Sequence, residues 1–163
     1  MSTPIVVELQ RFCDQSRTLE TEFVPTQLPR LLESVADSQG RVSMRVRGFV
    51  DARGRPSLDF SAEAALGVLC TRCLRPMPVV VEVQQTLAFD NAEIDDELDL
   101  DTIETLPMVQ HLDLVELLEE ELLLALPMLP KHDACEAPGP ATIGRTSVFS
   151  GLQGLMDSTD GTT

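Results

Sequence analysis

Hydrophobic and polar residues alternate over three stretches near the middle of the chain. These stretches are 42–50, 58–68 and 79–89. A period of two is typical of a β-strand with one buried and one exposed face. Turn-forming residues 51–56 separate the first two stretches, and a Cys-x-x-Cys sequence separates the second from the third. The pattern therefore predicts an antiparallel β-meander whose first strand carries Arg45 and Arg47 on its exposed face.

Three further elements are predicted outside the meander. Alternation of Ile5, Val7 and Leu9 indicates a short strand, and the spacing of leucines in 26–40 predicts a helix that Gly40 ends. A second helix is expected to begin at Asp113, which is followed three residues later by Glu116 as in a capping box, and to end before Pro127. Its predicted sheet-facing residues are Leu114, Val115, Leu118, Leu122 and Ala125.

The elements together predict one α+β domain, an antiparallel β-meander packed against helices. We place this domain at residues 1–135, because 136–163 is rich in Gly, Pro, Ser and Thr and is expected to be a largely flexible tail with a short apolar segment. That segment includes Phe149 and Leu152, which are candidates for contact with another protein. The acid-rich residues 91–107 are expected to form a solvated connection that contains a short extended piece.

Charge divides the chain into unequal parts. The net charge is −15, yet residues 41–75 contain seven Arg against three acidic residues, whereas 82–121 contain fourteen acidic residues and no Lys or Arg. An acidic protein is repelled by nucleic-acid phosphates except where a basic patch is presented, so basic proteins are its easier partners. We therefore assign Arg45 and Arg47 as candidate RNA contacts. Three glutamates on the predicted exposed face of the second helix are candidate contacts with a basic protein: Glu116, Glu119 and Glu120.

Four residues near the meander and the second helix have the spacing of metal ligands. Cys70 and Cys73 form a Cys-x-x-Cys pair, and His132 and Cys135 stand three apart just beyond the second helix. Two such pairs brought together by the fold make a tetrahedral Cys₃His set, which suits one structural zinc ion. The same residues also fit a metal-free thiol cluster. A redox role is disfavoured because strands flank the Cys-x-x-Cys, whereas a thioredoxin-like pair lies at the start of a helix.

The sequence also resembles a known family. The segments "LCTRCLRPMPVVVEV" and "EEELLLALPMLPKHDAC", separated by an acidic connection, are similar to the YceD family of large ribosomal RNA subunit accumulation proteins. The family's terminal Asn-Pro-Phe is replaced here by Ser147-Val148-Phe149. The shared positions are Cys70, Cys73, Asp113, Leu114, Leu126, Pro127, Pro130, His132 and Cys135.

The resemblance implies a non-enzymatic cytoplasmic factor for 23S rRNA accumulation in large-subunit biogenesis. Its implied partners are pre-50S components, a basic large-subunit ribosomal protein or 23S rRNA among them, with no membrane and no small-molecule substrate. Two other functions stay open on the residues alone. One is a zinc-stabilised module that binds a basic protein without any RNA, and the other is a Cys-x-x-Cys thiol oxidoreductase.

Overall fold

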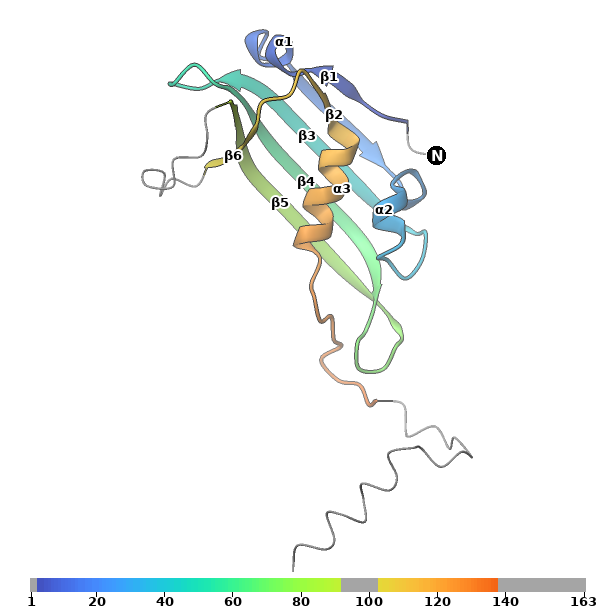
Figure 1. Ribbon diagram of the computed structural model, residues 1–163. Helices are drawn as coiled ribbons and strands as arrows, with labels where there is room; N and C mark the ends of the chain where they lie inside the picture. The colour runs from blue at the N-terminus through green and yellow to red at the C-terminus, as the bar shows by residue number, and fades with distance from the viewer. Residues whose placement is uncertain (1–2, 92–102, 138–163) are drawn as a thin grey trace, which may run out of the picture.

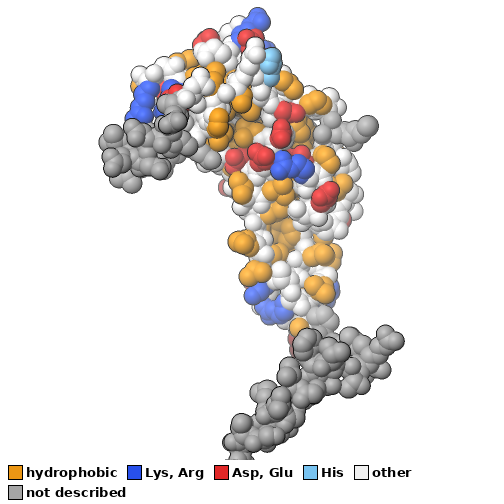
Figure 2. Space-filling model, viewed as in Figure 1, with side chains coloured by type: hydrophobic (Ala, Val, Ile, Leu, Met, Phe, Trp, Pro, Cys, Tyr) orange, Lys and Arg blue, Asp and Glu red, His pale blue; other side chains and the backbone are white. Residues whose placement is uncertain are grey.

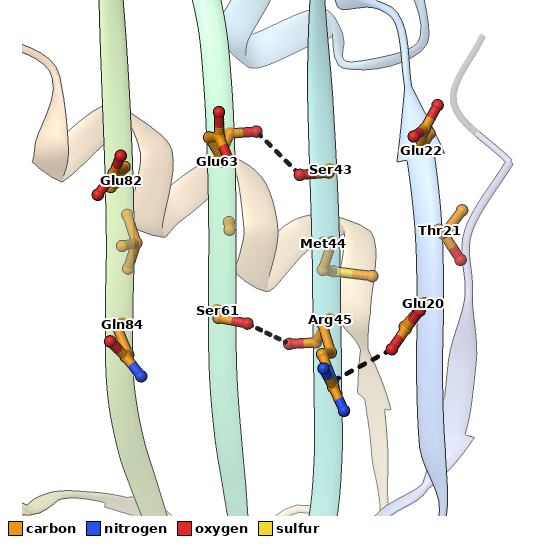
Figure 3. Close-up of a pocket in the computed structure, with 12 residues that line it drawn as sticks. Glu20, Thr21, Glu22, Ser43, Met44, Arg45, Ser61, Glu63, Glu82 and Gln84 are labelled. Atoms are coloured by element: carbon orange, nitrogen blue, oxygen red, sulfur yellow. Dashed lines mark hydrogen bonds and ion pairs between the residues drawn. The ribbon is translucent and has the colours of Figure 1, made fainter.

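A computed structural model of the chain describes residues 3–91 and 103–137, and its main feature is a five-stranded sheet (Figure 1). The elements in chain order are β1 (Val6–Glu8), α1 (Leu9–Asp14), β2 (Thr18–Phe23), the 3₁₀ turn η1 (Pro25–Gln27), α2 (Pro29–Leu32), β3 (Gly40–Val50), β4 (Pro56–Leu69), β5 (Pro76–Asp90), β6 (Ile103–Pro107), β7 (His111–Asp113) and α3 (Leu114–Ala125). The sheet has the order β2-β3-β4-β5-β6. Helix α3 crosses one face of it, and acidic side chains gather over this helix (Figures 1 and 2). On the opposite face, which we call the open face, no described element covers the strands (Figure 3). The α+β class predicted from sequence is confirmed.

The core forms where the alternating side chains of the sheet meet α3. The inward positions are buried from Val42 to Gly48 in β3 and from Pro56 to Val68 in β4, while the positions between them face the open side. Burying apolar side chains stabilises the fold by roughly 25 cal/mol per Å² removed from water. The strands predicted at 42–50, 58–68 and 79–89 are confirmed. Residues of the sheet that are fully buried include Val42, Met44, Val46, Leu58, Phe60, Ala64 and Leu87.

Helix α3 begins where the sequence predicts. The Asp113 carboxylate caps it by accepting a hydrogen bond from the backbone N–H of Val115 at 2.9 Å, which satisfies one of the unpaired N–H groups of the first turn. Leu114, Leu118 and Leu122 are buried against the sheet. Two details of its apolar face differ from the sequence prediction, because Leu117 is buried and Ala125 is exposed.

The helix predicted over 26–40 is wrong in extent. Only the three residues of η1 and the four of α2 are helical, and the chain then turns toward β3. Pro25 and Pro29 each stand at the first position of their own short element, so they divide the segment instead of continuing one helix. Gly40 begins β3 with φ +136°, a conformation that side-chain-bearing residues rarely adopt. The edge strand β2 was not predicted.

The sheet is mixed, in contrast to the purely antiparallel meander expected from sequence. Strands β2 to β5 are antiparallel neighbours, but β6 runs parallel to β5 and pairs only with Thr86–Asp90. The predicted N-terminal strand exists as β1, and it pairs with β7 immediately before α3. Leu9 does not extend this strand but begins the short helix α1. Within the described residues, no helix is long and apolar enough to cross a membrane.

Candidate metal centre

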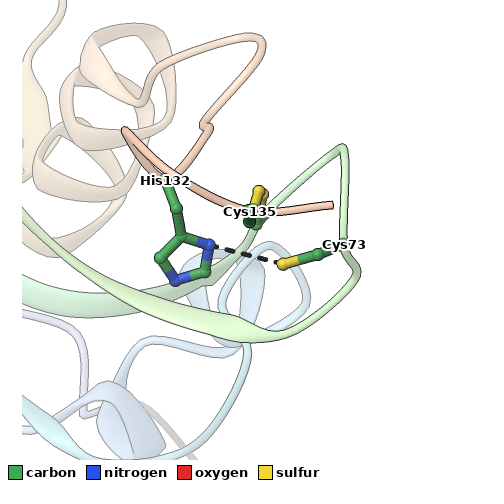
Figure 4. Close-up of side chains that lie close together, drawn as sticks. Cys73, His132 and Cys135 are labelled. Carbon is green, nitrogen blue, oxygen red and sulfur yellow. Dashed lines mark hydrogen bonds between the residues drawn. The ribbon is translucent and has the colours of Figure 1, made fainter. Parts of the chain in front are cut away.

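The four predicted ligands lie together at the end of the β4–β5 hairpin. Cys70 and Cys73 come from the connection between these strands, and His132 and Cys135 come from the extended segment that follows α3 (Figures 1 and 4). Their ligand atoms all lie within 4.8 Å of one another. The prediction that the two pairs meet is therefore confirmed, although about sixty residues separate them in the chain.

The hairpin connection has a shape that presents both sulfurs to one side. The backbone N–H of Cys70 donates to the Arg75 carbonyl at 2.9 Å, and that of Leu74 donates to the Cys70 carbonyl at 2.9 Å. Leu74 has φ +58°, the left-handed conformation that reverses the chain just after Cys73. The strands end at Leu69 and resume at Pro76, so both cysteines belong to a tight turn and not to a helix.

Polar contacts hold the second pair of ligands against this turn. The Thr71 backbone N–H and hydroxyl both donate to the Pro130 carbonyl, at 2.8 and 3.1 Å. The guanidinium of Arg72 donates to the carbonyl of Cys135 at 2.9 Å and to that of His132 at 3.5 Å. The two residues between the cysteines therefore bind the segment that carries the other two ligands. Sequence reasoning did not assign Thr71 or Arg72 to the site, and their position inside the Cys-x-x-Cys was the available signal.

The electrostatic environment favours negative charge on Cys70. Burial opposes ionisation of this thiol, yet its pKa is lowered to about 5. The backbone N–H groups of Cys73, His132 and Arg72 donate toward its sulfur, as does the His132 ring. Hydrogen bonds to a charged form favour that form, so the turn stabilises a thiolate.

Neighbouring groups also shift the pKa values of the other three ligands. The backbone N–H of Arg75, together with its guanidinium, lowers the pKa of Cys73. Hydrogen bonds to Cys70, and then to Cys73, raise the pKa of His132. Burial and the neighbouring thiolates raise the pKa of Cys135. A dication among these groups would relieve the repulsion between the sulfurs, and binding it would release protons from the ligands.

Two short separations inside the cluster match the edges of a zinc tetrahedron. Zn–S bonds of about 2.3 Å and Zn–N bonds of about 2.0–2.1 Å place neighbouring sulfurs about 3.8 Å apart and sulfur and nitrogen about 3.5 Å apart. Here Cys70 Sγ and Cys135 Sγ are 3.7 Å apart, and Cys73 Sγ and His132 Nδ1 are 3.4 Å apart (Figure 4). The donor set fits zinc in both chemistry and spacing.

Thiol chemistry at Cys70 is restricted by access. A reactive cysteine combines a lowered pKa with exposure to its substrate. Cys70 has the lowered pKa but is 0% exposed. The fourth cysteine, Cys13, lies in the core instead, where its Sγ donates to the Ser57 carbonyl at 3.3 Å and burial raises its pKa.

The candidate RNA contacts lie on the open face of the sheet, as predicted. Arg45 and Arg47 are both exposed. Arg45 Nε is 3.2 Å from Glu20 Oε1, so its charge is partly neutralised, and Arg47 stands directly across from Asp59 in the β3–β4 register. RNA contact by these arginines stays a prediction.

The candidate protein contacts on α3 require one correction. Glu116 and Glu120 are exposed, but Glu119 is buried with 4% of its surface accessible. Its carboxylate accepts the backbone N–H groups of Arg30 at 2.7 Å and Leu31 at 3.2 Å, and thereby caps α2. Placing Glu119 on the exposed face was wrong, because the helix period does not reveal that α2 packs over this position. The other two candidates, Phe149 and Leu152, lie outside the described residues.

Comparison with protein families gives a match for this chain. The model of the family described as "Large ribosomal RNA subunit accumulation protein YceD" matches residues 58–147, which is more than half of the chain. The matched region runs from β4 through α3 and includes all four residues of the cluster. No solved structure matches the chain.

Proposed function

The chain belongs to the YceD family of large ribosomal RNA subunit accumulation proteins, and we propose that it is a non-enzymatic cytoplasmic factor for 23S rRNA accumulation in large-subunit biogenesis. The observation that carries the proposal is the extent of the family match, which spans both halves of the Cys/His cluster and the helix between them. The protein is proposed to act by binding a partner and not by catalysis, because the cluster joins two chain segments.

One structural zinc ion on Cys70, Cys73, His132 and Cys135 is part of the proposal. Structural zinc sites are closed by four protein ligands, whereas catalytic sites keep one position for water. Here the two pairs supply four protein ligands, as a structural site requires, without a further ligand. Bound zinc would supply a fixed link between the β4–β5 turn and the segment after α3, and it would not take part in a reaction.

The proposed partners are pre-50S components, with a basic large-subunit ribosomal protein and 23S rRNA as the two candidate contacts. The net charge of −15 supports a basic protein as the main partner, since phosphates are repelled except at local basic patches. Glu116 and Glu120 are the exposed acidic candidates on α3, and Arg45 and Arg47 are the candidates for rRNA.

A thiol oxidoreductase is the second candidate, and the lowered pKa of Cys70 favours it. Such an enzyme would attack a substrate disulfide with the Cys70 thiolate, which releases one thiolate and forms a mixed disulfide. Cys73 would then attack the Cys70 sulfur, which releases the second thiol and leaves a Cys70–Cys73 disulfide that an added dithiol must reduce. The burial of Cys70 opposes this role, because the sulfur has no exposed surface from which to attack. Catalysed reduction of a small disulfide by the zinc-free protein, lost in Cys73→Ser, would support the enzyme over the binding factor.

Metal analysis tests the zinc site directly. Protein purified without chelator is expected to contain about one zinc per chain. Cys73→Ser should lose most of it, and Co²⁺ substitution should give thiolate-to-metal absorption in the wild type alone. Cys13→Ala is the matched control, since it removes a thiol from the core and leaves the cluster intact. Substoichiometric zinc that Cys73→Ser leaves unchanged would remove zinc from the proposal.

Cellular assays test the ribosomal role. A strain without the gene should contain less 23S rRNA relative to 16S rRNA, and the wild-type gene should restore the ratio. In sucrose gradients the protein should migrate with pre-50S particles at low salt and leave them at high salt. An unchanged rRNA ratio together with no particle association at low salt would contradict the proposed function.

A further inference from the structure

We propose that residues 76–85 of β5, together with the hollow beside them on the open face, bind an extended basic segment of a partner protein. This inference rests on the proposed function for the origin of that partner, a basic component of the large subunit. We call the site the edge surface and define it by Ala65, Gly67, Pro78, Val80, Glu63 and Glu82. Three separate observations support it.

The first observation is an open sheet edge. Strand β6 pairs with β5 only at Thr86–Asp90, so among the described residues no strand lies beside Pro76–Gln85 on that side. Pro76 and Pro78 lack an N–H group, which leaves 79–85 as the stretch able to pair. Outward backbone groups on such an edge are available to an added strand.

The second observation is an apolar hollow next to this edge. It has a volume of about 410 Å³, and small residues of β3 and β4, Gly40, Ala65 and Gly67, line it. Proline side chains and Val80, which is 66% exposed, line it from β5. Exposed apolar surface of this kind costs free energy in water, so an apolar side chain of a partner would stabilise it.

The third observation is a pair of like charges placed side by side. Glu63 of β4 stands directly opposite Glu82 of β5, and both carboxylates reach the open face (Figure 3). Like charges directly opposite each other destabilise a sheet. Neither makes an ion pair within the part of the chain described, whereas Glu20, on the same face, lies 3.2 Å from Arg45. A cation beside Glu63 and Glu82 would remove the repulsion.

These features fit one kind of occupant. Side chains of an extended segment point to the same face at every second residue. A segment paired with 79–85 would therefore place an apolar side chain beside Val80 and a Lys or Arg beside Glu82, two positions along. Nucleic acid does not fit, because its phosphates would meet both carboxylates. The acid-rich residues 91–107 of the same chain do not fit for the same electrostatic reason.

A defined peptide tests the edge surface with the full-length protein. The probe is a fluorescein-labelled seven-residue peptide, Val-Thr-Lys-Thr-Val-Thr-Lys, in which Val and Lys alternate at every second position and so share one face. The control, Val-Lys-Val-Lys-Thr-Thr-Thr, has the same composition but places Val and Lys on opposite faces. Anisotropy of the label measures binding. The alternating peptide should bind more tightly, and it should slow amide hydrogen exchange at 79–85.

Charge-matched variants locate the binding. Glu63→Gln with Glu82→Gln should weaken the alternating peptide about tenfold. Glu8→Gln with Glu33→Gln removes the same charge from exposed positions outside every proposed contact and should change affinity less than about twofold. Equal weakening by both pairs, equal binding of both peptides, or protection elsewhere would overturn the proposal. If Phe149→Ser in the unliganded protein speeds exchange at 79–85, the chain's own C-terminal residues occupy the edge, and the proposed partner is wrong. Peptide binding with unchanged 23S rRNA in the deletion strain would instead reject only the ribosomal role.

Discussion

Replacing Glu119 should destabilise the protein far more than replacing its neighbour Glu120. Both side chains contact the short helix α2, but in different ways. Glu119 is buried and accepts the backbone N–H groups of Arg30 and Leu31 at 2.7 and 3.2 Å. Glu120 makes an exposed ion pair with the Arg30 guanidinium at 3.3 Å. The pair of positions therefore separates a buried cap from a surface charge contact.

The magnitude follows from the two hydrogen bonds. A hydrogen bond to a charged group contributes about 1.5–3 kcal/mol, and a buried donor left unpaired costs about 1–3 kcal/mol. The bond from the Arg30 N–H is partly buried and that from the Leu31 N–H is buried, so water can replace Glu119 more readily at the first than at the second. We therefore expect Glu119→Ala to lower the free energy of unfolding by about 2–4 kcal/mol. Glu119→Gln keeps a neutral acceptor and should cost about half as much, whereas Glu120→Ala should cost less than about 1 kcal/mol.

Equilibrium urea unfolding, followed by far-UV circular dichroism, measures these differences. Intrinsic fluorescence is a poor probe here because the chain has no Trp and no Tyr. The Glu119→Ala loss corresponds to a melting temperature lower by roughly 6–12 °C. Zinc is held at saturating concentration so that metal binding does not differ between variants. If Glu119→Ala and Glu120→Ala agree within about 0.5 kcal/mol, Glu119 is not the cap of α2.

Three other perturbations have defined outcomes. Arg45→Gln with Arg47→Gln should weaken the salt dependence of binding to pre-50S particles. The slope of log K against log salt should decrease in magnitude by about 0.7–0.9 per lost phosphate contact, and an unchanged slope would remove these arginines as RNA contacts. Without metal, the folded pKa of Cys70 of about 5 lies below its ordinary value of 9.0, so the stabilising effect of this thiolate is complete above pH 9 and is lost as pH falls toward 5. Urea unfolding of the zinc-free protein should therefore show wild type gaining stability over Cys70→Ser between pH 5 and 9, and parallel curves would contradict the lowered pKa. Gly48→Ala should cost about 1–3 kcal/mol in the same assay, because the new Cβ would lie 2.6 Å from Phe12 Cδ1 and 2.8 Å from the Phe12 carbonyl oxygen; a loss under about 0.5 kcal/mol would show that α1 can move away.

The three long strands could be predicted because β3 and β4 bury one face along most of their length and β5 partly buries one face. Burial of every second residue leaves an unambiguous pattern in the sequence, and it also placed Arg45 and Arg47 on the open face. The helix α3 was equally readable from Asp113 and Pro127, which mark its two ends by local chemistry. In these elements the local sequence and the tertiary contacts favour the same structure.

The failures occur where tertiary contacts decide. Leucines spaced as on a helix between 26 and 40 are buried by two short helical elements, η1 and α2, and not by one continuous helix. Glu119 has the sequence context of a surface residue, and only the N–H groups of α2 make its burial favourable. The parallel pairing of β6 depends on a long connection, which no local pattern encodes. The Cys/His cluster was predictable because ligand spacing records the metal's geometry and does not depend on the path between the pairs.

The position of the cluster explains why this fold would need a metal. Strand β3 pairs with β4 only as far as Leu66, whereas the pairing of β4 with β5 continues to Leu69 and Pro76. A two-stranded ribbon is marginally stable in water by itself, and two of the residues that open β5 are prolines, which cannot donate to a ladder. The cluster closes this ribbon against the segment after α3, at the end farthest from the support of β3. Zinc at this point would stabilise the hairpin end more than the core, and the edge surface begins on this ribbon, at Gly67 and Pro78. Metal occupancy and binding of a basic partner should therefore be coupled through the order of one hairpin.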